Sequence, residues 1–194
     1  QAFAVPLASI AAVEPWRLPL PEPGFRLRLV SGARFPLGVA ARDPTPILTA
    51  LAEAGVTSAG GAARHPIFAW ARAKAEAGRW TWRHLAVKYP LFALLPAGVL
   101  LNAHQHIAYG GTWGQWYLEG PAAWMRTVLV YWVIVTIYLV LYASAWRGVV
   151  EAASLVAALG GDAAARRARR LAELVARIAY YAGVPMLLAL RFAE

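Results

Sequence analysis

The sequence predicts an α-helical membrane protein with three transmembrane helices and a small N-terminal α+β domain. The chain has 194 residues, of which 60% are hydrophobic and only 15% charged, and its mean hydropathy is +0.48. Soluble domains carry about 25% charged residues. Two long segments, 89–118 and 127–146, contain no charged residue, and each reaches the ~20 helical residues that cross a hydrocarbon core of ~30 Å. The residues before them show the alternation and turns of a small sheet.

The N-terminal part, residues 1–56, is expected to form a cytoplasmic domain. In GFRLRLV the apolar residues alternate with Arg26 and Arg28, as in a strand with one buried face. SGAR predicts a hairpin turn into a second strand, FPLGVA. A helix is then predicted in DPTPILTALAEAG, with Asp43 as its N-cap and Pro44 in its first position.

These segments also resemble a known family. VPLASIAAVEPW, GFRLRLVSGARFPLGV and DPTPILTALAEAG together look like the latter part of a bacterial pleckstrin-homology-like (PH-like) domain, over residues 3–55. The resemblance implies a partial β-barrel closed by a capping helix. It also implies a scaffolding or membrane-proximal interaction module, and it implies no catalytic residues. The segment has room for only part of the family's barrel.

The middle segment, residues 57–86, is expected to connect this domain to the membrane. VTSAGGAA is rich in small residues and predicts a flexible linker. A basic amphipathic helix, from about Pro66 to Ala77, is expected to follow it and to lead into the first span.

Residues 87–194 are predicted to be the transmembrane domain, with spans at about 89–109, 125–146 and 171–190. The third span is the least regular, because only residues 178–190 lie between charges and Pro185 is expected to bend the helix. Glu173 and Arg177 lie four residues apart, so they can pair on one helix face.

The basic residues predict the orientation of the chain. Six of them lie in 64–88 and six in 147–177, whereas the loop between the first two spans has only Arg126 and the C-terminus only Arg191. Because cytoplasmic loops carry the excess of Lys and Arg, we expect the N-terminal domain on the cytoplasmic side of a bacterial inner membrane and the C-terminus outside.

A basic run in the segment between the second and third spans is a candidate contact surface. Its arginines are expected on a helix near the membrane, with their charges solvated or on lipid headgroups. A docking site for an acidic partner or a specific lipid is the alternative. Nucleic acid is disfavoured, since no binding motif accompanies the run. The residues concerned are Arg166, Arg167, Arg169 and Arg170.

Two histidines at the end of the first span are the candidate cofactor ligands. Successive helical residues turn by ~100°, so His104 and His106 would lie on opposite faces of a helix. A chain already extended at Asn102 would bring both rings to one side and permit metal binding. The other histidines, His65 and His84, precede the first span, so this chain alone cannot build a bis-histidine haem site. Polar residues at the interface are the main interpretation. Haem or bacteriochlorophyll bound with a partner chain is the alternative.

The aromatic residues after these histidines favour a membrane interface. Trp113, Trp116 and Tyr117 are expected to form an aromatic belt that contacts lipid or a partner. The alternative is a quinone or pigment pocket built from Tyr109, Trp113 and Trp116.

The functional prediction depends mainly on the catalytic motifs and reactive residues that the sequence lacks. The sequence has no cysteine, no Walker A loop, no GxSxG and no HExxH motif, and no charged residue lies in the middle of the first two spans. We therefore expect no enzymatic activity and no cofactor. The sequence favours a non-catalytic inner-membrane subunit, or an assembly or scaffold factor, that contacts other membrane subunits and anionic lipids. The alternative is a redox- or pigment-binding subunit that uses His104 or His106 with a partner chain.

Overall fold

The computed structural model describes residues 4–20, 22–77 and 81–193, and for 191–193 the backbone alone. Arg79 and the side chain of Arg191, which both enter the charge count, lie outside the described residues. The chain divides into two compact units. Unit 1 comprises Gln1–Gly78 and Val150–Ala172, and unit 2 comprises Arg79–Val149 and Glu173–Glu194. Each is described by itself.

Unit 1 begins with a three-stranded antiparallel sheet. A short 3-10 turn, η1 (Leu7–Ser9), leads into β1 (Ile10–Pro15), β2 (Gly24–Leu29) and β3 (Arg34–Ala40), in the order β1-β2-β3. The predicted alternation in β2 is confirmed: Phe25 is fully buried, while Arg26 and Arg28 are exposed.

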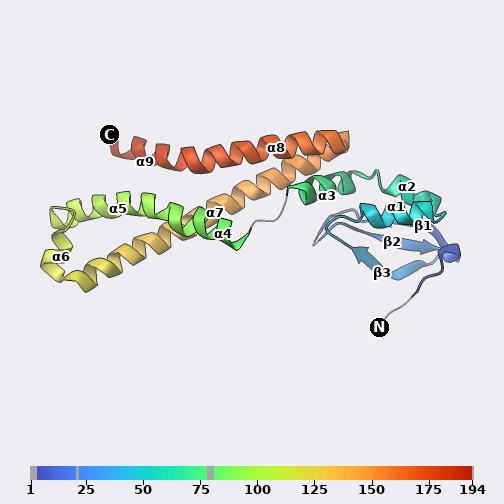
Figure 1. Ribbon diagram of the computed structural model, residues 1–194, viewed down its shortest axis with the longest axis horizontal. Coiled ribbons are helices and arrows are strands. Elements are labelled where there is room, and N and C mark those ends of the chain that lie inside the picture. The colour runs from blue at the N-terminus through green and yellow to red at the C-terminus, as the bar shows by residue number, and fades with distance from the viewer. Residues whose placement is uncertain (1–3, 21, 78–80, 194) are drawn as a thin grey trace. The chain divides into compact units, whose positions relative to one another are not determined.

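One face of the sheet is covered by α1 (Thr45–Glu53) and α2 (Thr57–Ala62), as Figure 1 shows. The hydrophobic core between them contains Val13, Phe25 and Leu48. The N-cap residue of α1 is Pro44 rather than the predicted Asp43, although the Asp43 carboxylate accepts a hydrogen bond of 3.0 Å from the Thr45 backbone N–H. Helix α1 begins just after Pro44 rather than at it.

The segment predicted to be a flexible linker instead forms α2. The Ser58 hydroxyl accepts a hydrogen bond of 3.1 Å from the backbone N–H of Val13 in β1, and Ala59 is fully buried in the core. Small residues let this short helix approach the sheet closely. Tertiary contacts therefore overcome the weak helix propensity of its two glycines.

The expected helix after α2 is present as α3 (Pro66–Glu76). It is a core element: Ile67, Phe68, Trp70 and several alanines are buried. Its alanine-rich face packs against residues around Ala158 in η3 (Ala158–Gly160) and Ala165 in α8 (Asp162–Ile178). Unit 1 therefore joins the small sheet to the turn between two long helices.

Unit 2 consists of long helices. A continuous helical segment contains α4 (Trp82–Ala86), the π-helical turn η2 (Val87–Leu91) and α5 (Phe92–Tyr109). It is followed by α6 (Gly114–Glu119) and α7 (Pro121–Ala157). Helix α8 continues through a second π-helical turn, η4 (Ala179–Gly183), into α9 (Val184–Ala193).

Within the described residues, three helical stretches are long and apolar enough to cross a membrane: Trp82–Tyr109, Pro121–Gly160 and Asp162–Leu190. Each contains one of the predicted spans, so the coarse fold class is confirmed. Helix α7 alone has 37 residues, about 55 Å at 1.5 Å per residue. It is therefore considerably longer than a hydrocarbon core of ~30 Å.

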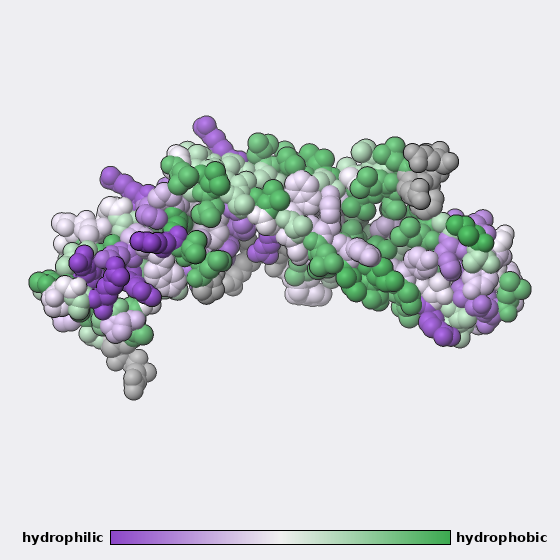
Figure 2. Space-filling view, turned by 180° about the vertical axis from the view of Figure 1, so that it is seen from behind, coloured by the Kyte–Doolittle hydropathy of each residue, from purple (hydrophilic) through white to green (hydrophobic). Residues whose placement is uncertain are grey.

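The core of unit 2 is narrow. Ala93 and Ala97 of α5 meet Val135 and Leu139 of α7, with Tyr180 of η4 beside them. Small residues at such contacts let helices approach closely. Many other large apolar side chains of these helices are exposed, and Figure 2 shows hydrophobic residues in green gathered over them. Apolar surface of this kind is suited to hydrocarbon rather than to water.

Candidate functional site

The position at which α5 ends determines whether the two histidine side chains lie on the same side of the chain. Helix α5 continues to Tyr109 and ends at Gly110, whose φ of +73° is the left-handed conformation typical of a helix C-cap. Helix α5 therefore ends at the same residue as the first predicted span. Because the chain is helical at both histidines, His104 and His106 lie on different faces of α5.

Each histidine has its own surroundings. The His104 ring is half-buried, with its centroid 6.0 Å from the ring of Tyr109 and 5.5 Å from that of Tyr131 in α7. His106 is exposed, and its Nδ1 lies 2.9 Å from the carbonyl oxygen of Asn102. His106 also lines a shallow, open depression together with Asn102 and two apolar residues. His104 is thus part of a helix contact, whereas His106 faces outward.

Between the histidines, Gln105 anchors a buried polar contact that the sequence analysis did not single out. Its Nε2 donates to Gln115 Oε1 of α6 at 2.8 Å, and its Oε1 accepts from the Gln115 backbone N–H at 3.2 Å. Both side chains are buried. A pair of amides satisfied in this way fixes α6 against the end of α5.

The network extends to Glu119, the last residue of α6. Its carboxylate accepts hydrogen bonds from Gln115 Nε2 at 2.8 Å and from the Tyr109 hydroxyl at 3.0 Å. The bond from Gln115, and then that from Tyr109, lowers the pKa of the Glu119 carboxyl below its ordinary value. These groups are occupied with one another, which indicates a structural role.

The tryptophans nearby pack on one another. Trp113 and Trp124 are stacked with ring centroids 5.0 Å apart, and Trp116 meets Trp124 edge-on at 5.6 Å. Tyr117 is 82% exposed. Tyr109, which a quinone pocket would bring to Trp113 and Trp116, instead contacts His104 and Glu119. The exposed rings are suited to a membrane interface.

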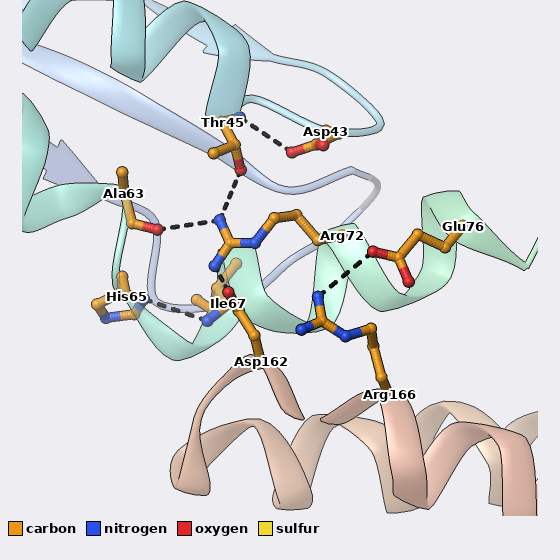
Figure 3. Close-up of polar contacts among 9 residues, drawn as sticks. All are labelled: Asp43, Thr45, Ala63, His65, Ile67, Arg72, Glu76, Asp162 and Arg166. Atoms are coloured by element: carbon orange, nitrogen blue, oxygen red, sulfur yellow. Dashed lines mark hydrogen bonds and ion pairs between the residues drawn. The ribbon is translucent and has the colours of Figure 1, made fainter. Parts of the chain in front are cut away.

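In unit 1, Arg72 of α3 joins three elements (Figure 3). Its guanidinium donates to the Thr45 hydroxyl of α1 at 2.7 Å and to the Ala63 carbonyl oxygen at 3.0 Å, and it pairs with the carboxylate of Asp162 in α8. The Arg72 side chain is only 18% exposed. The Arg72 guanidinium therefore connects α3 to α1, to the end of α2 and to α8 within unit 1.

The structure divides the basic run of α8 into two kinds of arginine. Arg169 is 8% exposed and forms a two-point ion pair with Glu151 of α7, at 3.1 and 3.0 Å, while Arg166 contacts Glu76 of α3 at 3.4 Å. Arg167 and Arg170 are exposed, and neither forms an ion pair within the described part of the chain. Only these two present free charge at the surface.

Side-chain donors connect the helices of unit 2 at the two π-helical turns. The Tyr180 hydroxyl donates to the Lys88 carbonyl oxygen at 2.7 Å. The Trp132 indole N–H donates to the Pro90 carbonyl oxygen at 2.8 Å. The Tyr142 hydroxyl approaches the Ala179 carbonyl oxygen at 3.4 Å. Proline and a π turn both interrupt the ordinary helical ladder, and these aromatic donors bind carbonyls at the interruptions.

No family model, curated protein or solved structure matches this chain. Among the residues that the structure describes, no group of three or more His, Asp or Glu side chains is placed to hold a metal ion.

Proposed function

We propose that this protein is a non-catalytic integral membrane subunit, or an assembly or scaffold factor, of a larger membrane complex. It resides in a bacterial inner membrane, with its N-terminal domain cytoplasmic and its C-terminus outside. The distribution of basic residues supports this orientation. The small sheet with its capping helix serves as an interaction module of the PH-like kind.

The observation that carries the proposal is the position of Tyr138 in α7. It lies within the charge-free segment 127–146, about 12 Å along the helix from the nearer end, which is farther than a tyrosine side chain extends. Tyr138 is 68% exposed, and within the described residues its hydroxyl has no hydrogen-bond partner. Trp132 and Tyr142 on the same helix both bind carbonyl oxygens.

A hydroxyl at that depth favours a second protein. A polar group that faces hydrocarbon without a partner costs several kcal/mol in the limit of no compensation. A neighbouring transmembrane helix that offers an acceptor removes this cost, and hydroxyl groups commonly connect helices in this way. Tyr138 therefore marks the face of α7 on which a partner helix binds.

Unit 1 supports the same function. Its two most buried ion pairs are Arg72–Asp162, between α3 and the start of α8, and Arg169–Glu151, between α8 and α7. These side chains are occupied by structural contacts that hold the elements of unit 1 together. A fixed module of this kind is suited to recruiting or aligning another subunit.

Photo-cross-linking in native membranes tests the proposal. A photoreactive residue at Tyr138 should cross-link one stoichiometric membrane protein. The same probe at Val140, about 200° around the helix, should not. Tyr138→Phe keeps the ring and removes the hydroxyl, so it should weaken co-purification of that protein about threefold, the size of an average interhelical hydrogen bond in a membrane. Cross-linking to lipid alone from both positions would contradict the proposal, as would substrate turnover by the isolated chain.

A second candidate function rests on the exposed His106 and the depression beside it. In this alternative, His106 supplies one axial ligand to haem or bacteriochlorophyll and a partner chain supplies the rest of the site. The absorption spectrum of the natively purified complex distinguishes the two functions. A Soret or bacteriochlorophyll band that disappears in His106→Ala but persists in His84→Ala supports this alternative, and a featureless spectrum contradicts it.

A further inference from the structure

Three basic residues stand at the ends of the three charge-free stretches. Lys88 comes directly before residues 89–118, Arg147 directly after 127–146, and Arg177 directly before 178–190. All three belong to unit 2, one each from η2, α7 and α8. Both arginines lie close enough to Lys88 to act on it electrostatically. Packing supports this proximity, because the Lys88 ammonium lies over the ring of Tyr180, three residues after Arg177, and Tyr142, five residues before Arg147, stacks on the same ring.

Aromatic rings fix the position of Lys88 within this group. Its Nζ lies 5.0 Å from the ring centroid of Tyr180 and 5.5 Å from that of Tyr89. The Tyr180 hydroxyl in turn donates to the backbone carbonyl of Lys88 at 2.7 Å, and Tyr142 stacks on the Tyr180 ring. An ammonium over tyrosine faces is held by cation–π attraction, so the packed tyrosines form a rigid support for the charge.

The charge of this group is only partly balanced. Arg147 is exposed and forms no ion pair within the described residues. Arg177, with 71% of its side chain exposed, pairs with Glu173 on its own helix at 3.9 Å, and exposed pairs of this spacing are weak. Positive charges in one neighbourhood repel one another. An anion bound among them relieves that repulsion.

The location identifies the anion. Residues that border a charge-free membrane segment lie at the level of the lipid headgroups, where phosphate groups are abundant. We propose that Lys88, Arg147 and Arg177 together bind the phosphate of one anionic phospholipid. The neighbouring exposed side chains of Ile178 and Tyr181 offer apolar surface to its acyl chains. This inference does not depend on the proposed partner subunit.

Native mass spectrometry of the full chain in detergent tests the site. Phosphatidylglycerol and phosphatidylcholine with identical acyl chains are titrated against the wild type and three single variants, Lys88→Gln, Arg147→Gln and Arg177→Gln. Each variant should bind phosphatidylglycerol about fivefold more weakly, because a basic residue near anionic lipid contributes about one such factor. Binding of phosphatidylcholine should stay unchanged. Arg126→Gln removes the same charge elsewhere and should leave both affinities within about twofold.

Two further measurements separate the proposal from its competitors. Lys88→Arg keeps the charge and should retain at least half of the affinity, whereas a purely structural role of Lys88 predicts no such rescue. Inorganic phosphate at millimolar concentration should not displace the lipid, since it lacks acyl chains. Equal affinity for the two lipids contradicts the proposal, as does equal weakening in the Arg126 control. Displacement by free phosphate, or by an acidic peptide bound more tightly than the lipid, also contradicts it.

Discussion

The ion pair between Arg169 and Glu151 should contribute strongly to the packing of α8 on α7. The two nitrogen–oxygen distances are 3.1 and 3.0 Å, and the side chains are 10% and 22% exposed. Opposite charges about 4 Å apart attract by ~4 kcal/mol at an effective dielectric constant of ~20. Removing one member of a buried pair typically costs about 3–5 kcal/mol. Since Glu151 retains some contact with solvent, we expect Glu151→Gln to cost about 3 kcal/mol.

A double variant tests the origin of this effect. Arg169→Met with Glu151→Met removes both charges together with their desolvation penalty, so it should cost about 1 kcal/mol or less. The double-mutant cycle should then give a coupling free energy of at least ~2 kcal/mol. Arg170→Met provides a matched control, because the neighbouring arginine is exposed and its loss should stay within about 0.5 kcal/mol.

Hydrogen exchange on the full chain in detergent measures these free energies locally. Amides of α8 within residues 165–170 report the opening of the helix contact. A loss of 3 kcal/mol corresponds to exchange about a hundredfold faster, since 1.4 kcal/mol is a factor of ten. Two results would refute the reasoning: less than a tenfold change in Glu151→Gln, or a double variant that is as unstable as the two single variants added together.

Three further outcomes are expected. Tyr180→Phe removes the hydroxyl that donates to a carbonyl of η2 and should lower the stability of unit 2 by about 1 kcal/mol, seen as a lower melting temperature in detergent. Gly110→Ala places a side chain in a left-handed conformation and should cost about 1–2 kcal/mol in the same assay. Gly111→Ala, at a position with open space around it, should be nearly neutral. Tyr109→Phe removes one of the two donors that lower the pKa of Glu119, so NMR titration should find that pKa closer to its ordinary value. Because the folded pKa lies below the unfolded one, the stabilisation by Glu119 is present above the ordinary carboxyl range and disappears as pH falls through the lowered pKa.

Local signals in the sequence predicted much of the fold. The alternation around Phe25 depends on neighbouring residues and is confirmed. The first predicted span ends at residue 109, and α5 ends there because Gly110 adopts the left-handed conformation. Helix α2 was missed because its order comes from β1, through Ser58 and the buried Ala59. A composition rich in Gly and Ala carries no sign of such a distant contact.

The candidate sites also divide into features that depend on local sequence and features that depend on distant contacts. Helical geometry predicted that His104 and His106 would diverge, because that conclusion needs only the rotation per residue. The pairing of Arg169 with Glu151 joins residues 18 positions apart on two helices, and spacing alone does not reveal it. The sequence likewise marks Tyr138 as one of several aromatics in its span. Only the packing of the helices shows which of them lie inward.

The π-helical turn η4 also changes which side chains the third long helix presents to its neighbours. A π turn accommodates one residue more than an α-helical turn, and one residue corresponds to ~100° of rotation. The faces of α8 and α9 are therefore out of phase, although the helix is continuous from Asp162 to Ala193. The arginine-bearing face of α8 and the apolar faces of α9 are thus oriented independently. Deleting one residue from η4 would restore a single phase and turn every side chain of α9 toward a different neighbour.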